Sequence, residues 1–483
     1  MIIPQTTRMK QSNMLASSTI AAISTPPGKG GVAVIRISGD EALAVAKGIF
    51  KPRFAEGLDF IAPRKQIYGD ILSSGEQIDD GLLTYFPAPN SYTGEDIVEI
   101  SCHGGILVTR MVLEAALAAG AVAADRGEFT KRAFINGKLT LTETEAISML
   151  LEAESEAQVK LSREKSRKKL RESTDGIRAA LVSVLSSIFA RIDYPDEDLG
   201  DMTSDEVLSA INSARENVKA LIATYKMGRA VTFGVPTVIC GKPNVGKSTL
   251  YNLLVGENAA IVTDIPGTTR DVLEKSISLG NVLLKLWDTA GIREGEVDAV
   301  EAIGIERSRE RIAGADLVFA LFDSSEELDS EDRRILDFLA GSNAVKIAIF
   351  TKNDINANKD LQKCEKIKKE VLSFGFDEAL SISAKEDGDF ARRALCELVE
   401  SLFCDEKLTV GDDAIVHSAR QHAALKRADE FLAGAAAALE SGLPEDAVSS
   451  DVELALGAIS ELDGRAVSEE VVADIFAKFC VGK

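Results

Sequence analysis

Hydrophobic and polar positions alternate in different ways along the chain, and each pattern predicts a different kind of structure. From about residue 19 to 135, short apolar stretches such as 32–37 and 96–100 are separated by turns, and positions 108–119 have a helical pattern. Short strands mixed with a helix in this way are typical of an α+β unit.

A helical pattern occupies about residues 140 to 229 and returns after about 408. In its first part, apolar residues recur at helical spacing, at Ile177, Leu181, Val184, Leu185, Ile188 and Ile192. The sequence Tyr194-Pro195-Asp196 ends that helix. From residue 237, strands and helices alternate as they do around a parallel sheet. This order predicts a helical domain with an α/β domain inserted into it.

The length and composition narrow the class of protein. A chain of 483 residues exceeds one compact core and favours about two to four domains. Residues 1–18 are polar, and no stretch approaches the roughly 18 apolar residues of a membrane span, so we expect neither a signal peptide nor a span. We interpret residues 1–18 as a disordered extension or as the product of an upstream start codon. The six cysteines lack CxxC spacing and there are three histidines, which disfavours zinc and disulfides and predicts a cytoplasmic protein.

The net charge of −21 argues against broad, nonspecific binding of nucleic acid, because such affinity comes from lysine and arginine neutralising phosphates. It leaves room for a local basic surface. One basic run comprises Arg163, Lys165, Arg167, Lys168, Lys169 and Arg171. We interpret this run as the solvated face of a helix.

The strongest chemical signal is the segment Gly241-Lys242-Pro243-Asn244-Val245-Gly246-Lys247-Ser248. It follows the apolar stretch 237–240 and opens a helical pattern, which is the setting that a phosphate-binding loop requires. Its glycines let backbone N–H groups surround the phosphates, and the helix N-terminus adds a favourable dipole. Lys247 is expected to reach the β- and γ-phosphates, and the Ser248 hydroxyl is expected to bind Mg²⁺.

Three downstream motifs agree with that loop in order and spacing. Asp288-Thr289-Ala290-Gly291 follows the stretch 282–287, where the aspartate supports Mg²⁺ and the glycine amide senses the γ-phosphate. Thr351-Lys352-Asn353-Asp354 follows 345–350, and the Asp354 carboxylate can accept from both N–H groups of guanine, a pair that adenine lacks. Thr351 stands where asparagine is commoner. Ser383-Ala384-Lys385 completes the base contacts, so the motifs predict a GTP-binding domain.

The catalytic apparatus differs from that of Ras-like GTPases, which orient the attacking water with a glutamine after Asp-x-x-Gly. Ile292 occupies that position and cannot hydrogen-bond water. With Asn244 and the segment 263–271, this combination resembles the potassium-activated GTPases of the TrmE–Era–EngA–YihA–septin class, and specifically the TrmE (MnmE) family.

That resemblance implies a catalytic apparatus built around cations. K⁺ would be held by Asn244, Thr268 and the main-chain oxygens of Thr263 and Ile265, in the place of an arginine finger worth about 10³- to 10⁵-fold in rate. Thr269 would complete the Mg²⁺ shell with Ser248. Glu301, ahead of an Ile-Gly-Ile stretch, would position the water. The GTP-binding set is then Asn244, Val245, Gly246, Lys247, Ser248, Thr249, Thr263, Asp264, Ile265, Pro266, Gly267, Thr268, Thr269, Asp288, Thr289, Ala290, Gly291, Thr351, Lys352, Asp354, Ser383, Ala384 and Lys385.

Both flanks extend the resemblance over nearly the whole chain from about Ser18. The chain ends Phe479-Cys480-Val481-Gly482-Lys483, similar to the Cys-x-Gly-Lys signature of the family, and Ile475, Phe476 and Phe479 predict that this tail is docked. N-terminal segments similar to the family's are 25–28, 36–39, 91–96, 103–105, 126–129 and 136–139. His103 is expected to be structural, within its glycine-rich turn.

The resemblance implies a multidomain α/β plus α fold. Its parts are a tetrahydrofolate-binding and dimerising α+β domain at 19–137, a helical domain at 138–232 and 408–483, and an inserted P-loop (Ras-like) G domain at 233–407. The folate-contacting positions correspond to Arg36, Glu99, Lys138 and Lys483, where a carboxylate suits the pterin edge and cations suit the glutamate tail or a carbonyl. Cys480 would be a nucleophile or proton carrier.

The implied activity is GTP-driven addition of an aminomethyl or carboxymethylaminomethyl group to C5 of the tRNA wobble uridine. It would use a homodimer, an FAD-binding partner of the MnmG (GidA) family in a heterotetramer or larger complex, and a 5-formyl- or methylene-tetrahydrofolate. Two alternatives remain open: a regulatory or ribosome-assembly GTPase without one-carbon chemistry, and a P-loop kinase or ATPase. Folate binding would decide the first, and competition between GTP and ATP the second.

Overall fold

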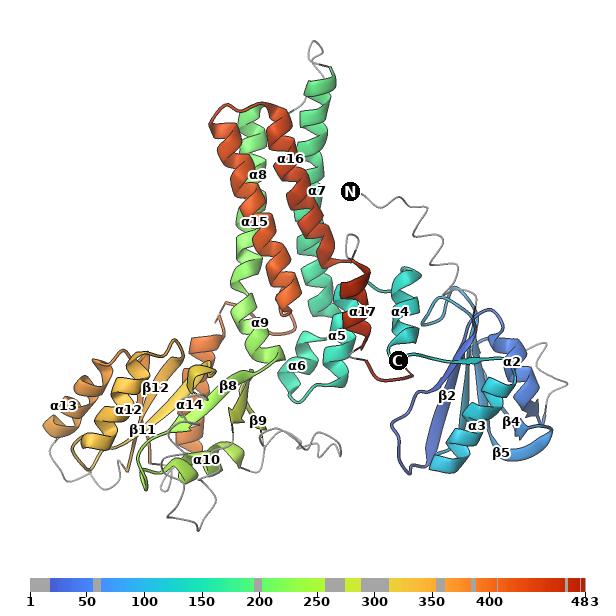
Figure 1. The fold of residues 1–483 in the computed structure, drawn as a ribbon, viewed down its shortest axis with the longest axis horizontal. Coiled ribbons are helices and arrows are strands. Elements are labelled where there is room, and N and C mark those ends of the chain that lie inside the picture. Colours follow the sequence, from blue (N-terminus) through green and yellow to red (C-terminus); the bar gives the residue numbers. More distant parts are fainter. Residues whose placement is uncertain are drawn as a thin grey trace. The chain divides into compact units, whose positions relative to one another are not determined.

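A computed structural model describes residues 18–54, 62–194, 202–256, 274–287, 312–352, 361–383, 388–405, 407–464, 468–477 and 479–482 (Figure 1). By their contacts the residues fall into two compact units. The first comprises Met1–Ser148 with Ser460–Lys483, and the second comprises Met149–Ile459. The end of the chain therefore groups with its beginning.

The described part of the first unit contains a seven-stranded sheet. Its strand order is β3-β4-β5-β6-β2-β1-β7, antiparallel except between β1 and β7. The strands are β1 (Ile20–Ile23), β2 (Val32–Ser38), β3 (Phe50–Pro52), β4 (Gln66–Ser73), β5 (Glu76–Phe86), β6 (Ile97–His103) and β7 (Val122–Ala123). The helices α2 (Ala42–Ile49) and α3 (Ile106–Ala118) pack on the sheet and on each other. The predicted α+β unit is confirmed.

Alternation along β2 and β6 decides which side chains enter the core of this unit. Ala33, Ile35 and Ile37 on β2 belong to the core cluster beneath α2 and α3, as do Val98, Ile100 and Cys102 on β6. Successive side chains of a strand point to opposite faces, so Arg36 and Glu99, which are partners in the strand register, lie on the other face.

The C-terminal tail is docked within the first unit, as the sequence predicts. Helix α17 (Glu469–Ala477) packs on α4 (Glu128–Ile135), with the rings of Phe134 and Phe476 6.3 Å apart. Phe476 and Phe479 are buried. Val481 forms an isolated β-bridge with Arg126, and the Ser24 hydroxyl donates to the Gly482 carbonyl at 3.1 Å. Helix α5 (Leu141–Leu151) follows α4 in the chain.

The second unit contains long helices before and after an α/β region (Figure 1). Its helical part comprises α6 (Glu156–Leu161), α7 (Glu164–Asp193), α8 (Ser204–Ala223), α9 (Tyr225–Thr232), α15 (Ala419–Glu440) and most of α16 (Glu445–Leu462). Helix α8 packs between α7 and α15. The predicted apolar spacing holds in α7, where Ile177, Leu181, Val184, Leu185 and Ile188 are buried, whereas Ile192 in the last turn is exposed.

The basic run at the start of α7 is a solvated helix face, as interpreted from the sequence. Four of its six cations are exposed and paired with carboxylates: Lys165 with Asp412, Lys168 and Lys169 with Glu172, and Arg171 with Asp175. These carboxylates offset part of the positive charge that this face could offer to nucleic acid.

The α/β region is built on a sheet whose described strands run in the order β13-β12-β11-β8-β10-β9. They are β8 (Val235–Cys240), β9 (Glu274–Leu279), β10 (Val282–Trp287), β11 (Leu317–Asp323), β12 (Val345–Thr351) and β13 (Glu378–Ser381). Neighbours are parallel, as predicted, except that β9 and β10 form an antiparallel edge pair. The helices are α10 (Lys247–Val255), α12 (Ser330–Ala340), α13 (Leu361–Leu372) and α14 (Gly388–Phe403).

Strand β11 shows why the strands of this region are continuous apolar runs in the sequence. Leu317, Phe319 and Leu321 enter one core cluster, and the alternate residues Val318, Ala320 and Phe322 enter the other. Strands covered on both faces by helices are apolar at every position. Within the described ranges, no helix combines the length and hydropathy needed to cross a membrane.

Candidate functional site

The phosphate loop connects β8 to α10 through backbone that favours glycine. Gly241 and Gly246 have φ of 148° and 109°, and a Cβ on Gly241 would lie 2.8 Å from the Leu321 carbonyl oxygen. Asn244 has a φ of 58°, in the left-handed region that asparagine tolerates better than most residues. The two glycines are therefore required by the path of the loop itself.

Lys247, the first residue of α10, folds back over this loop. Its Nζ donates to the carbonyl oxygens of Gly241 and Lys242, both at 2.8 Å. An ammonium has three N–H groups, so within the described part of the chain one is left to meet a phosphate. Burial lowers the pKa of Lys247, since the charged form loses hydration. The side chain is thus preorganised at the position where the sequence expects the β- and γ-phosphates.

The base-recognition motif is tied directly to the phosphate loop. The buried Thr351 hydroxyl donates to the Val245 carbonyl at 2.6 Å and lies 3.3 Å from the Phe322 carbonyl. Threonine in place of the commoner asparagine therefore still connects the end of β12 to the loop. Lys352 follows with a φ of 58°, and its Nζ donates to Asp323 at 2.6 Å.

Several of the predicted site residues meet at one edge of the sheet. Strands β8, β11, β12 and β13 are parallel, so the phosphate loop, Thr351, Lys352 and Ser383 all lie at their carboxyl ends. Open α/β sheets bind ligands at this edge. Ser248 and Thr249 lie in the first turn of α10. The predicted residues outside the described ranges are Thr263, Asp264, Ile265, Pro266, Gly267, Thr268, Thr269, Asp288, Thr289, Ala290, Gly291, Glu301, Asp354, Ala384, Lys385 and Lys483.

Lys242 is a phosphate-loop residue whose partners sequence reasoning missed. Its Nζ lies 3.3, 3.0 and 3.2 Å from carboxylate oxygens of Glu326, Asp329 and Asp332 at the start of α12. Burial alone would lower the pKa of Lys242, but the carboxylates outweigh it and raise that pKa. The sequence signal that could have indicated these partners is the three acids at three-residue spacing, Glu326, Asp329 and Asp332, where an apolar helix begins. These ion pairs anchor Lys242 of the loop to the segment that leads into α12.

The sheet face of the first unit carries two of the predicted folate residues as an ion pair. Arg36 donates from Nε and Nη2 to one Glu99 oxygen, at 2.8 and 2.7 Å. The guanidinium carbon lies 5.6 Å from the ring centroid of Tyr92 and 5.7 Å from that of Phe129. Cation–π contact and the carboxylate together fix the guanidinium on this face.

Lys138 and Cys480 lie on segments that adjoin this face. The Lys138 Nζ donates to the Pro89 carbonyl at 3.0 Å, on the loop that also bears Tyr92. Cys480 is exposed, and its carbonyl accepts from the Gly127 N–H at 3.3 Å, two residues before Phe129. His103, expected to be structural, bonds Asp79 through its ring Nδ1 at 2.7 Å and its backbone N–H at 2.8 Å.

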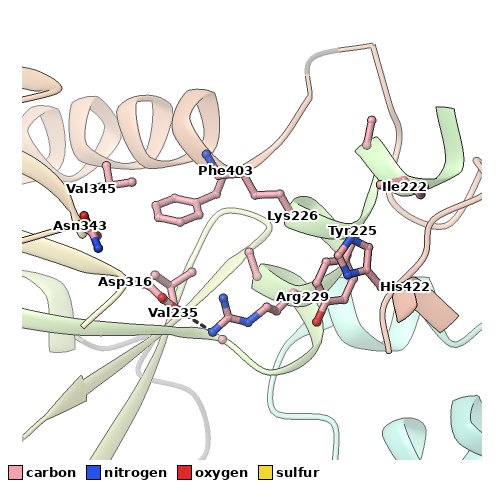
Figure 2. Close-up of a pocket in the computed structure, with 13 residues that line it drawn as sticks. Ile222, Tyr225, Lys226, Arg229, Val235, Asp316, Asn343, Val345, Phe403 and His422 are labelled. Atoms are coloured by element: carbon pink, nitrogen blue, oxygen red, sulfur yellow. Dashed lines mark hydrogen bonds and ion pairs between the residues drawn. The ribbon is translucent and has the colours of Figure 1, made fainter. Parts of the chain in front are cut away.

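A cavity of about 370 Å³ lies at the other edge of the second sheet (Figure 2). Val235 and Val345, which begin parallel strands, line it together with Asp316. The Tyr225 and His422 rings stack at 4.0 Å, and Arg229 of α9 pairs with Asp316 at 2.7 Å. No residue of the predicted nucleotide set lines this cavity. Its ion pair joins α9 to the α/β region, at the edge opposite the phosphate loop.

Two family models match this chain. Residues 19–138 match the family model described as the GTP-binding protein TrmE N-terminus, and residues 141–480 match the MnmE helical domain. The chain belongs to the MnmE family. The phosphate loop lies within the region matched by the helical-domain model.

Relatives of the MnmE family align over their full length. The tRNA modification GTPase MnmE of Thermotoga maritima is 40% identical over 471 residues, which cover 96% of this chain and 100% of the relative. The protein of the same name from Clostridioides difficile is 37% identical over 470 residues, which cover 97% and 100%. Among solved structures, Aquifex aeolicus Era bound to GDP·AlF₄⁻ is 26% identical over 40% of this chain and 65% of its own, with a TM-score of 0.26, too low to inform the fold.

Proposed function

We propose that this chain is a K⁺-activated GTP hydrolase that, with an FAD-dependent partner, adds an aminomethyl or carboxymethylaminomethyl group to C5 of the tRNA wobble uridine. Membership of the MnmE family makes it a GTP-hydrolysing enzyme of tRNA modification. The observation that carries the site assignment is the Lys247 ammonium, which is folded onto two carbonyl oxygens of its own loop with an N–H left for a phosphate.

In the GTP site, the chain's own residues bind the phosphates and select the base. Lys247 neutralises the β- and γ-phosphates, and the amides of the phosphate loop surround them. Asp354 accepts from guanine, and Ser383, Ala384 and Lys385 complete the base contacts. Glu301 orients the attacking water. It takes the role that a glutamine has in Ras-like GTPases, where this chain has Ile292.

The metal ligands in this proposal are side-chain hydroxyls for Mg²⁺, and for K⁺ the Asn244 amide, the Thr268 side chain and the main-chain oxygens of Thr263 and Ile265. Mg²⁺ would be held by Ser248 and Thr269, and K⁺ by Asn244, Thr263, Ile265 and Thr268. The fit is supported at Asn244, a residue of the phosphate loop that carries an amide oxygen and has its backbone in the left-handed region. When bound, the two cations offset the negative charge that grows on the transferred phosphoryl group.

For the one-carbon chemistry, we propose a folate site on the sheet face that bears Arg36 and Glu99, with Lys138 and Lys483 as further ligands. A carboxylate paired with a guanidinium that lies against two aromatic rings suits a flat, donor-rich pterin. When bound, a 5-formyl- or methylene-tetrahydrofolate supplies the carbon. Cys480 is proposed as the nucleophile or proton carrier. Its carbonyl accepts a hydrogen bond from the N–H of Gly127, two residues before Phe129.

The proposed domains follow from these assignments. Residues 19–137 bind folate and dimerise the chain, 233–407 form the G domain, and 138–232 with 408–483 form the helical domain, although by their contacts the last residues, Ser460–Lys483, group with the first unit. The partners are a second copy, an FAD-binding protein of the MnmG (GidA) family in a heterotetramer or larger complex, and tRNA.

Potassium dependence tests the proposed hydrolytic mechanism. GTP hydrolysis is measured in KCl and in NaCl at equal ionic strength, and faster turnover in KCl is expected. Asn244→Gly is the matched variant, because glycine keeps the left-handed backbone while removing the side-chain oxygen. It should bind GTP but lose the stimulation by K⁺. Equal rates of the wild-type protein in the two salts would refute K⁺ activation.

A further inference from the structure

Strand β11 occupies the centre of the second sheet, between β8 and β12, yet no nucleotide motif accounts for its end. Its last residue, Asp323, is the register partner of Thr351 and reaches the same edge as the phosphate loop. An apolar run that finishes on a carboxylate at this edge places a charge beside the base-recognition motif.

The Asp323 carboxylate is buried, with a side chain that is 3% exposed, and both of its oxygens are used. Oδ1 accepts from the Ser325 backbone N–H at 2.9 Å and from the Ser325 hydroxyl at 2.6 Å, while Oδ2 accepts from Lys352 Nζ at 2.6 Å. Burial would raise the pKa of Asp323, but these bonds overcome it and lower that pKa. The carboxylate is therefore charged and held in one orientation.

Lys352 is correspondingly held at both ends. Its backbone lies in the left-handed region, with a φ of 58°, where a residue other than glycine needs support from its surroundings. The preceding Thr351 carbonyl accepts from the Ser324 N–H at 3.1 Å and from the Ser324 hydroxyl at 2.7 Å. At the far end, the ammonium is bound by Asp323. The alkyl stem between these points remains partly open, since the side chain is 38% exposed.

We propose that Asp323 is a positioning residue for guanine nucleotides: it holds the Lys352 ammonium so that the lysine stem is already extended where the base binds. The inference rests on the proposed assignment of Lys352 to the base site. A free lysine stem loses much of its rotamer freedom when a ligand orders it, and a stem anchored beforehand loses less. Asp323 thus acts on nucleotide affinity through Lys352, without touching the phosphates.

Nucleotide binding by full-length variants tests this role. Asp323→Asn keeps the shape and an oxygen for the Ser325 donors but removes the charge that holds Lys352. We expect GDP and GTP, measured with fluorescent analogues, to bind about tenfold more weakly, equivalent to about 1.4 kcal/mol, with kcat at saturating GTP close to that of the wild type. Asp337→Asn, an exposed carboxylate on α12, is the matched control and should bind as the wild type does.

A double-mutant cycle separates positioning from a general loss of stability. Lys352→Met keeps the stem without the ammonium, and adding Asp323→Asn to it should weaken binding by less than twofold further. If Asp323→Asn fails to fold, Lys352→Met still tests the inference, because it breaks the same ion pair from the other side. The inference requires Lys352→Met to bind nucleotide several-fold more weakly than the wild type. Wild-type affinity in either single variant, or fully multiplicative losses in the double variant, would overturn the inference. A wild-type protein that did not prefer guanine nucleotides would instead refute the proposed function.

Discussion

Replacing Thr351 by valine should weaken GTP binding through the phosphate loop. Valine reproduces the shape of threonine but lacks the hydroxyl that donates to the Val245 carbonyl at 2.6 Å. Both residues are buried, so solvent does not readily replace the lost donor. The loop then keeps its covalent path while losing the contact that joins it to the end of β12.

The size of the effect follows from the unpaired carbonyl. A buried polar group without its partner costs about 1–3 kcal/mol. If the whole cost appears in the nucleotide-binding form, the Kd for GTP rises roughly 5- to 150-fold, at about 1.4 kcal/mol for each factor of ten. The lower half of that range is expected, because part of the cost falls on the nucleotide-free protein and lowers its stability instead.

Fluorescence titration with a GTP analogue measures the binding, and thermal unfolding without nucleotide measures the cost to the free protein. Thr351→Ser is the matched control, since it keeps the donor and removes only a methyl group, and it should bind close to the wild type. Binding by Thr351→Val within twofold of the wild type, at unchanged stability, would refute the tether. Equal losses in both variants would show that the methyl group, and not the hydroxyl, matters.

Three further predictions concern catalysis, the tail and the helical connection. Glu301→Ala should lower kcat strongly while leaving GTP affinity nearly intact, as expected of a residue that acts in the transition state; an unchanged kcat would show that Glu301 takes no part in hydrolysis. Cys480→Ser should leave phosphate release close to wild type and abolish tRNA modification assayed with the FAD partner, because a hydroxyl has a much higher pKa than a thiol; a normal yield of modified nucleoside would exclude the thiol chemistry. Gly228→Ala should lower the unfolding temperature, because its Cβ would lie 2.0 Å from the Val416 carbonyl oxygen and overpacking costs about 1–3 kcal/mol. Gly176→Ala is the control and should not lower it, because the space around Gly176 is open. Equal unfolding temperatures of the two variants would contradict this packing.

The elements of the second sheet were predictable because burial dominates their sequence. Strands β8, β10 and β12 occupy the apolar stretches that the pattern marks, each within two residues, and helix α10 begins where the phosphate loop predicts a helix. The antiparallel direction of β9 was not predictable, since the apolar pattern of an edge strand does not depend on the direction in which the strand runs. The docking of the tail was indicated by Phe476 and Phe479, but its partners, Ser24 and Arg126, lie hundreds of residues earlier in the sequence.

In the candidate sites, too, local features were predictable from the sequence and contacts between distant segments were not. Motif spacing was enough to indicate Lys247 and Thr351, because each belongs to a short motif that directly follows an apolar strand. The pairing of Lys242 with the start of α12, and of Lys352 with Asp323, depends on β11 lying between β8 and β12, which spacing does not reveal. Arg36 and Glu99 were each expected at a ligand, whereas their mutual ion pair follows from the antiparallel register of β2 and β6.

The most direct test of the central claim is mass spectrometry of the nucleosides in total tRNA from cells that lack this protein. The account predicts that uridines carrying an aminomethyl or carboxymethylaminomethyl group at C5 disappear from the wobble position. Expression of the wild-type chain should restore them, and Lys247→Ala, which removes the phosphate-binding ammonium, should not. An unchanged content of these nucleosides in cells without the protein would contradict a role in wobble-uridine modification.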